Sequence, residues 1–219
     1  SPFCTAAGIA TDGSTGPAVR LTGPQVLIPP TLGTQRGGNL FHSFASFGIA
    51  SGESATFTTT SPAVQHIVAR VTGDAATTLD GRLVVRAEAG GSPALWLINP
   101  QGVAVGPNAR FDLAGALHLA TASELRLADG SRWATSGPAT SSLSAAAPQR
   151  FGFVGPAATA ALSWRGAVLA APAGAAVELA GGSVSMDGGR IATTQAPLRL
   201  DSQTDLQLAG GAAVQTLAN

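Results

Sequence analysis

The sequence predicts an all-β protein that folds as a parallel β-helix, and two features of its apolar residues lead to this prediction. No sustained stripe of apolar residues with a 3.6-residue period is present, so long α-helices are not expected. Instead, short runs alternate between apolar and polar residues and end at Gly, Pro, Asp or Asn, as half-buried strands do.

These runs also recur at a nearly constant distance near the C-terminal end. Three pairs of apolar residues show the recurrence: Val177 and Leu198, Val184 and Leu206, Met186 and Leu208. The period, about 22 residues, accommodates three short strands, which make one coil of a parallel β-helix. Successive coils then hydrogen-bond to each other, and their inward side chains stack into one long core.

The composition agrees with thin coils in a single domain. A chain of 219 residues fits one long β domain. The residues are 45% hydrophobic but only 5% aromatic, so the core is expected to hold mainly Ala, Val and Leu. A β-sandwich is the competing fold, but it would require antiparallel hairpins every 8–12 residues or so, and the sequence contains one convincing hairpin.

That hairpin is predicted for residues 124–134. Asp129-Gly130 separates two alternating runs, which is the strongest short signal for a tight β-turn. Because the hairpin interrupts the coil period, we place it outside the β-helix, packed on its flank. The Ser-, Pro-, Ala- and Thr-rich residues 136–149 are predicted to form a surface loop.

A second turn is predicted where Asn99-Pro100-Gln101-Gly102 follows an apolar strand. Proline fixes φ and glycine accepts a positive φ, so this pair reverses the chain at low steric cost. Asn99 has two interpretations: its side chain satisfies backbone groups and sets the path of the coil, or it contacts a partner directly. The two are compatible, because a partner can recognise a shape that Asn99 and Gly102 maintain.

Charge and cysteine content exclude several classes of partner and site. Twelve basic and twelve acidic residues give zero net charge, so neither nucleic acid nor an anionic membrane is an expected partner. The single Cys4 excludes an internal disulfide and a cysteine-based zinc site. No apolar stretch approaches the roughly 18 residues of a transmembrane helix.

The sequence contains no arrangement of catalytic or metal-binding residues. His42, His66 and His118 are far apart, and His42 is expected to be a partly buried structural residue. The acids stand mostly beside glycine, as turn residues do; Asp201 and Asp205 are the closest late pair. For the tryptophans, packing is favoured over exposed platforms for sugars; these residues are Trp96, Trp133 and Trp164. We expect no enzymatic activity, no cofactor and no metal.

A series of motifs, in order, resembles the secretion domain of two-partner secretion exoproteins, the filamentous-haemagglutinin family. They span roughly residues 8–155 at similar spacing: Gly38–Phe44, Gly52–Phe57, His66–Gly73, Leu79–Leu83, Leu95–Gly106, Gly106–Ala109, Leu125–Gly130 and Phe151–Phe153. Two departures are visible. Gln101 stands where members often have Asn, and the Asn-Pro-Asn-Leu motif of some members is absent, so the chain resembles the subgroup without it.

The resemblance implies a right-handed parallel β-helix with an N-terminal cap and β elements outside the helix. Residues 1–219 then form one secretion domain. Residues 1–35 are the cap region, 36–155 are the family core, and 156–219 are further coils. Val26–Pro30 is expected to belong to the cap and to cover the first coil, since an open coil exposes strand edges.

The resemblance also implies a function without catalysis. The domain would be recognised in the periplasm of a Gram-negative bacterium by POTRA domains of an outer-membrane β-barrel transporter, and it would be exported to the cell surface. There it would nucleate folding of a larger adhesin, cytolysin or contact-dependent toxin. A monomer is expected. The residues expected to serve in recognition or as the turn scaffold are Asn99, Pro100, Gln101, Gly102, Asn39, Leu40, Phe41, His42, Ser43 and Phe44.

Two other functions remain open at this point. One is an adhesion module that binds a surface glycan on a flat outward face of the β-helix. The other is a β-helix polysaccharide lyase or hydrolase, which requires clustered acids in a groove. The predominance of acids at turns argues against the enzyme.

The fold prediction can be checked by far-UV circular dichroism. We expect a spectrum dominated by β-structure, because the alternating runs leave no segment with helical periodicity. An α-helical content above about a fifth of the residues, which is still below the average for globular proteins, would contradict the prediction.

Overall fold

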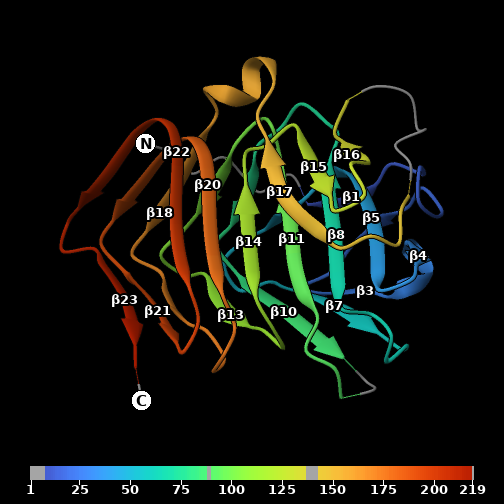
Figure 1. The fold of residues 1–219 in the computed structure, drawn as a ribbon. Coiled ribbons are helices and arrows are strands. Elements are labelled where there is room, and N and C mark those ends of the chain that lie inside the picture. The colour runs from blue at the N-terminus through green and yellow to red at the C-terminus, as the bar shows by residue number, and fades with distance from the viewer. Residues whose placement is uncertain (1–7, 88–89, 137–142, 219) are drawn as a thin grey trace.

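The chain forms a three-sided parallel β-helix with a small antiparallel sheet on its flank (Figure 1). The computed structural model describes residues 8–87, 90–136 and 143–218. Among these residues the only helical elements are two 3-10 turns, η1 (Pro30–Leu32) and η2 (Gly155–Ala158). No helix in the described part of the chain is long and apolar enough to cross a membrane.

Parallel strands from successive coils make up three faces of the β-helix. The first face contains β5 (Asn39–Ser46), β8 (His66–Val71), β11 (Ala94–Ile98), β14 (Leu117–Ala120) and the first halves of β20 (Val177–Asp187) and β22 (Leu198–Ala209). The second face contains β6 (Gly48–Ile49), β9 (Thr77–Leu79), β12 (Val103–Val105), β18 (Ala161–Arg165) and the second halves of β20 and β22. The long strands β20 and β22 therefore join the first and second faces.

The third face consists of two sheets. One contains β3 (Gln25–Ile28), β7 (Ser54–Thr59), β10 (Arg82–Ala87) and β13 (Arg110–Asp112), and the other contains β19 (Val168–Ala170), β21 (Arg190–Thr194) and β23 (Ala213–Leu217). Val26 belongs to β3, which is hydrogen-bonded in parallel to β7. This segment, which we expected in the cap, thus covers the first coil by extending the third face by one strand.

The observed register reproduces the late repeat found in the sequence. Val177 pairs with Leu198 in the first half of β20, and Val184 pairs with Leu206 in the second half. The second pair is separated by one position more than the first, because the register shifts between Gly181 and Ser183, where an extra residue enters β22. The sequence period therefore measured the length of one coil, including this irregularity.

Earlier coils vary in length, which explains why the sequence search did not detect them. Leu40 lies beside Ile67, Ile67 beside Leu95, and Leu95 beside Leu117, so the first two of these coils are longer than the late ones. The inward side chains of this column are almost completely buried and belong to one continuous core. The early core also holds a group of aromatic rings, in which Phe44 lies 5.0 Å from Phe47 and 6.1 Å from Phe57, measured between ring centroids.

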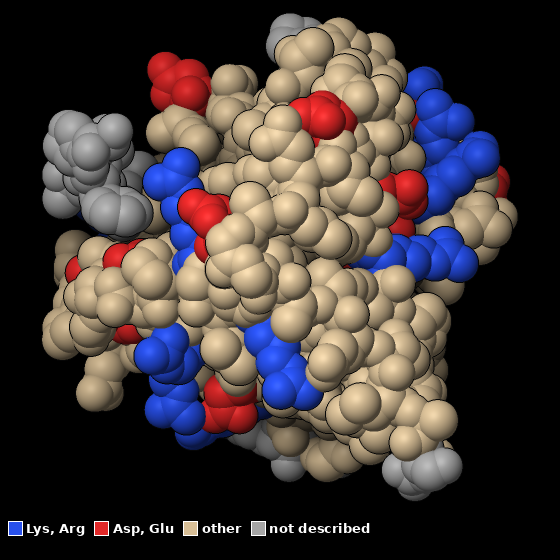
Figure 2. Space-filling view, turned by 90° about the vertical axis from the view of Figure 1, so that its left-hand side faces the viewer, with Lys and Arg blue, Asp and Glu red and all other residues tan. Residues whose placement is uncertain are grey.

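The two ends of the β-helix differ. At the N-terminal end, three short strands pair antiparallel around β5: β1 (Ile9–Thr11), β2 (Arg20–Leu21) and β4 (Thr34–Arg36). At the other end, β22 and β23 are each hydrogen-bonded on one side only. Leu206 is 47% exposed there, while Val184, its neighbour in the preceding coil, is 1% exposed. Figure 2 views this end and shows that uncharged residues cover most of it.

The sheet outside the helix has three strands rather than the two of a hairpin. β15 (Glu124–Leu127) pairs antiparallel with β16 (Arg132–Ala134) and also with β17 (Pro148–Gly152). The predicted loop 136–149 therefore ends earlier, at the start of β17; residues 137–142 lie outside the described part. A second apolar cluster fills the space between this extra-helical sheet and the first face, and it includes Phe41, Val68, Trp96, Leu125 and Trp133.

Arg70 joins three parts of the fold at one point. Its guanidinium donates through Nε to Ser43 Oγ at 2.8 Å, through Nη2 to Ser14 Oγ at 3.1 Å, and through Nη1 to the carbonyl of Ala134. It also lies 3.8 Å from the ring centroid of Trp133, a cation–π contact. Arg70 thus connects the N-terminal segment, the first face and the extra-helical sheet.

The charge of Arg70 is balanced by a neighbouring acid. Burial lowers the pKa of Arg70, and the charge of Asp12 partly opposes this shift. Burial disfavours ionised Asp12, but hydrogen bonds from Ser43, Ser14 and Thr72 together hold the pKa of Asp12 below its usual value. A buried cation is costly unless its hydrogen bonds are satisfied, so this cluster has to form as a unit.

We predict that Arg70→Met destabilises the domain by on the order of 3 kcal/mol, because it leaves the buried hydroxyl of Ser43 without its donor and Asp12 without its cation. Urea denaturation of the purified domain measures this loss. Arg82→Met is the matched control, since Arg82 forms an exposed ion pair with Asp112, and such pairs contribute about 0–1 kcal/mol. Equal midpoints for the two variants would show that the Arg70 cluster does not hold the three parts together.

Candidate functional site

The Asn99–Gly102 turn lies at the corner between the first face and the second, where β11 ends and β12 begins. Asn99 is fully buried. Its Nδ2 donates to the carbonyl of Ala75 and to Thr77 Oγ1, both at 3.0 Å, and its Oδ1 accepts the N–H of Gln101 at 2.9 Å. The side chain therefore closes its own turn and ties it to the preceding coil.

Gly102 adopts a backbone conformation that side chains rarely tolerate. Its φ is +128°, and a Cβ built there would lie 3.3 Å from the carbonyl oxygen of Ala161. The Gly102 N–H donates to the carbonyl of Asn99, and the Gly102 carbonyl accepts the N–H of Thr77. Gly102 and Asn99 are buried, Pro100 is partly buried, and Gln101 is exposed. Of the four side chains, that of Gln101 is the one presented to solvent.

The same corner in the next coil is where the chain leaves the β-helix. The Asn99 N–H donates to the carbonyl of Ala120, so Thr121 lies over Asn99. Thr121 Oγ1 donates to the carbonyl of Ala160 and accepts the N–H of Gly182. Ala160 is the residue at which the chain returns to the β-helix, directly before β18. Buried polar side chains thus close this corner in two successive coils.

The Asn39–Phe44 segment holds the extra-helical sheet against the β-helix. Leu40 and Phe44 point into the core, as does His42. On the other side of the strand, Asn39 Nδ2 donates to the carbonyls of Ser144 and Ala146 at 2.9 and 2.7 Å.

Phe41 and Ser43 lie on the same outward side. Phe41 lies 5.1 Å from Trp133 between ring centroids. Ser43 donates to Asp12 at 2.6 Å. All six side chains of the segment are buried, so the folded domain presents none of them to a partner.

His42 is more deeply buried than the sequence suggested. We expected partial burial, but its relative exposure is 0%. Its ring centroid lies 6.0 Å from that of Phe44 and 5.5 Å from that of Phe57. Burial lowers the pKa of His42 to about 4, and the Leu32 backbone partly opposes this shift. The imidazole is therefore neutral inside the aromatic part of the core.

The other two histidines flank Trp96 beneath the extra-helical sheet, an arrangement that sequence reasoning missed. The Trp96 and His118 rings stack in parallel with centroids 3.6 Å apart, and His118 Nδ1 lies 2.8 Å from Glu178 Oε2. The Trp96 indole N–H points to His66 Nδ1 at 3.4 Å. Burial, and then the proximity of His118, lowers the pKa of His66. In the sequence, this arrangement could be found only from the register of the coils, which places Trp96 beside His118. The inserted extra-helical sheet between β14 and β18 breaks the regular spacing from which that register could be inferred.

The tryptophans and the turn acids, which are the remaining candidate residues, serve in packing and in turns. Trp96, Trp133 and Trp164 have relative exposures of 6%, 1% and 0%, so the hypothesis that they form exposed sugar platforms is wrong. Asp12 and Asp129 accept backbone N–H groups two residues later, as turn acids do. Among the described residues, no three His, Cys, Asp or Glu side chains are close enough to hold a metal.

A comparison with known protein families identifies the family of this chain. A model of the TPS secretion domain, the secretion domain of two-partner secretion, matches residues 7–218. The chain belongs to this family. A search of curated proteins found no match. The match covers nearly the whole chain, including the coils after residue 155 for which the sequence motifs were less specific.

Membership fixes the broad function. A TPS domain is a secretion and folding domain of a two-partner secretion exoprotein rather than a catalytic domain. It implies a partner outer-membrane transporter and export from a Gram-negative bacterium. The turn and strand described above belong to this domain, and their burial determines how a partner can reach them.

The buried His42 makes a pH-dependent contribution to stability. Its pKa is about 4 in the folded domain, against about 6.5 when unfolded. The contribution is complete above pH 6.5 and is lost as pH falls from 6.5 to 4, by about 3 kcal/mol in total. The lowered pKa of Asp12 acts in a different range, because its contribution declines only near and below 3.8.

We therefore predict that His42→Gln has a flatter stability profile between pH 6.5 and 4 than the unmodified domain. Urea denaturation at several pH values measures the profile. His66→Gln is the comparison variant, since His66 is less buried. If His42→Gln lost stability as steeply as the unmodified domain, His42 would not be the group that titrates.

Proposed function

We propose that this TPS domain is the N-terminal secretion domain of a larger exoprotein and that POTRA domains of its transporter recognise it before it folds. The observation that supports this proposal is the burial of both motifs. In the folded domain, nine of the ten expected residues are buried or partly buried, and only Gln101 is exposed. A receptor that reads the Asn39–Phe44 strand has to bind it while it is still unpaired.

Strand addition provides a physical route for such recognition. Residues 39–46 form an extended strand whose two edges pair with β8 and β1 or β4 in the folded domain. In the unfolded chain these backbone groups are available to the edge of a receptor sheet, by β-augmentation. Alternate side chains such as Leu40 and Phe44 then provide apolar contacts on one side of the added strand.

Export is then followed by folding at the cell surface. The coils stack in order, and each new coil finds a hydrogen-bonding edge on the one before it. This makes the first coils the nucleus for the rest of the exoprotein, which we expect to be an adhesin, a cytolysin or a contact-dependent toxin. Burial of the apolar column in each new coil makes return through the transporter unfavourable.

We predict that Asn99→Ala combined with Gly102→Val lowers export through the partner transporter while delivery to the periplasm persists. Val resists the positive φ at position 102. Ala leaves the buried hydroxyl of Thr77 without its donor, at about 1–3 kcal/mol, and it also removes the bonds to the carbonyl of Ala75 and the N–H of Gln101. The measurement compares the surface and medium levels with the periplasmic level when chain and transporter are co-expressed.

Two controls separate recognition from folding. Gln101→Ala changes the exposed residue of the same turn. Gln101 bonds to Asn99 through its backbone N–H, which this substitution keeps. The variant should therefore be exported normally. Leu179→Ala empties a buried site in a later coil and should lower stability by about 2–5 kcal/mol. If Leu179→Ala reduced export as much as the turn variant does, the turn would act through folding alone. Unchanged export of the turn variant would shift the recognition role to Asn39–Phe44 and residues 66–73.

A further inference from the structure

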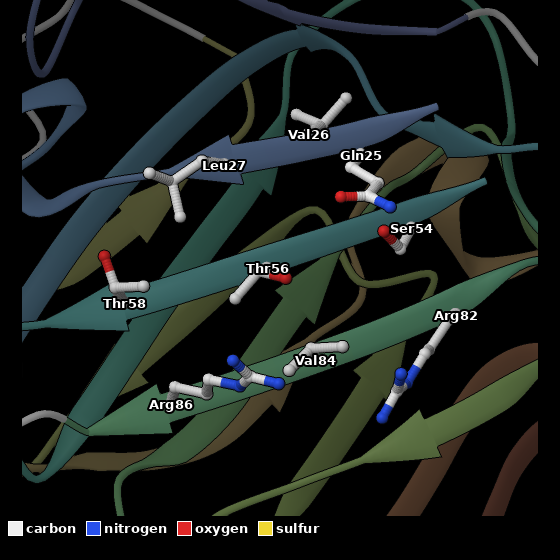
Figure 3. Close-up of a pocket in the computed structure, with 9 residues that line it drawn as sticks. All are labelled: Gln25, Val26, Leu27, Ser54, Thr56, Thr58, Arg82, Val84 and Arg86. Carbon is white, nitrogen blue, oxygen red and sulfur yellow. The ribbon is translucent and has the colours of Figure 1, made fainter. Parts of the chain in front are cut away.

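A groove crosses three strands of the third face, on the outward side of β3, β7 and β10. Its volume is about 590 Å³. Figure 3 shows the side chains that line it: Gln25, Val26, Leu27, Ser54, Thr56, Thr58, Arg82, Val84 and Arg86. None of these residues belongs to the turn or to the strand assigned above to recognition by the transporter. The groove thus lies on a different face from the residues assigned to recognition by the transporter.

The polar groups of the groove lie in ordered rows. Gln25, Ser54 and Arg82 are in register across the three strands, and Thr58 is in register with Arg86. Figure 3 shows the two arginine side chains on either side of Val84, with Thr56 on the adjacent strand. Positions four residues apart on one strand are separated by about 13 Å. The groove therefore offers two arginine side chains that start from fixed positions on one strand, with hydroxyl groups on the adjacent strand.

The charge of this sheet favours an anionic ligand. Its strands carry three outward arginines, Arg82, Arg86 and Arg110, and one outward acid, Asp112. Asp112 binds Arg82 at 2.7 Å, in a pair that is about half exposed. Such a pair is weak and easily exchanged for a ligand carboxylate or sulfate. In a chain of zero net charge, this is a local excess of positive charge.

The lining favours a saccharide over a protein or a nucleic acid. β7 and β10 are each hydrogen-bonded on both sides, so a peptide could add as a strand only at β3, the edge strand at one border of the groove. Leu27 is the one strongly exposed large apolar side chain in the groove, whereas protein interfaces usually have a buried apolar centre. Among the described lining residues there is no aromatic ring to stack a base, and two arginines are few for a phosphate backbone. Hydroxyl, amide and guanidinium groups match the hydroxyls and acidic groups of a polysaccharide.

We propose that the groove across β3, β7 and β10 binds an acidic polysaccharide, carboxylated or sulfated, lying along the third face. Arg82 and Arg86 bind acidic groups of two different sugar units. Ser54, Thr56, Thr58 and Gln25 hydrogen-bond to hydroxyls between them. This function does not depend on how the transporter recognises the domain.

The test uses the purified folded chain and calorimetric titration at low ionic strength. Heparin is the sulfated probe, polygalacturonate is the carboxylated probe, and dextran is the neutral one. We expect binding to one or both acidic polymers and none to dextran. The double variant Arg82→Gln with Arg86→Gln should weaken that binding by about tenfold or more. Thr56→Val, which replaces a hydroxyl by a methyl group of similar size, should weaken it without any change of charge.

The matched control is Arg150→Gln. Arg150 is exposed and lines a different groove, of about 410 Å³, in which Glu178 and Asp201 partly offset three arginines. This variant should leave the affinity within about twofold of the unmodified domain. Equal weakening by Arg150→Gln, equal affinity for duplex DNA, or no effect of Thr56→Val would show nonspecific attraction of polyanions and overturn the proposal. Absence of binding to both acidic polymers would also overturn it.

Discussion

The register between coils is the constraint on which the rest of this structure depends. Each inward residue must lie over its counterpart in the preceding coil, because the parallel hydrogen bonds and the apolar column are formed by the same residues. Leu40, Ile67, Leu95, Leu117 and Val177 follow one another in this way, although their spacing in the sequence is far from constant. A shift of one residue would turn the whole inward set outward. Extra residues are therefore accommodated mainly between strands, and among the parallel pairs of the described coils the register shift near Gly181 is the exception within a strand.

The corners follow from this constraint. A corner carries backbone groups that no sheet pairs, and at a buried corner these groups need side-chain partners. Asn99 provides such partners in one coil and Thr121 in the next. This arrangement allows the chain to leave the β-helix after Thr121 and to return at Ala160 without disturbing the coils on either side. The extra-helical sheet of β15, β16 and β17 lies between these two points in the sequence. The turn at residues 99–102 is thus adjacent to the point at which the chain leaves the β-helix for the extra-helical sheet.

The sequence predicted those parts of the fold that depend on local chemistry. The Asp-Gly turn of the 124–134 segment, the positive φ of Gly102 and the register of β20 with β22 could all be inferred from neighbouring residues or from a constant period. The third strand of the extra-helical sheet could not, because Pro148–Gly152 lacks alternating apolar residues and is a strand by virtue of its pairing with β15. The stack of Trp96 on His118 and the bonds of Asn99 to Ala75 and Thr77 depend on which coils meet. The sequence does not reveal which residues of neighbouring coils lie side by side when the coils differ in length.

The long-range contacts of the first coils also set an order for folding. Asn39 finds its amide partners at Ser144 and Ala146, far along the chain, and Arg70 reaches Ala134. Phe41 likewise packs on Trp133. The first coils can therefore form their parallel hydrogen bonds early, but their outward side remains uncovered until the extra-helical sheet has been added. Until then the outward side chains of β5, such as Asn39 and Phe41, lack these partners. Docking of the extra-helical sheet then buries the outward side of β5, so this one packing event completes the apolar packing on both sides of the strand.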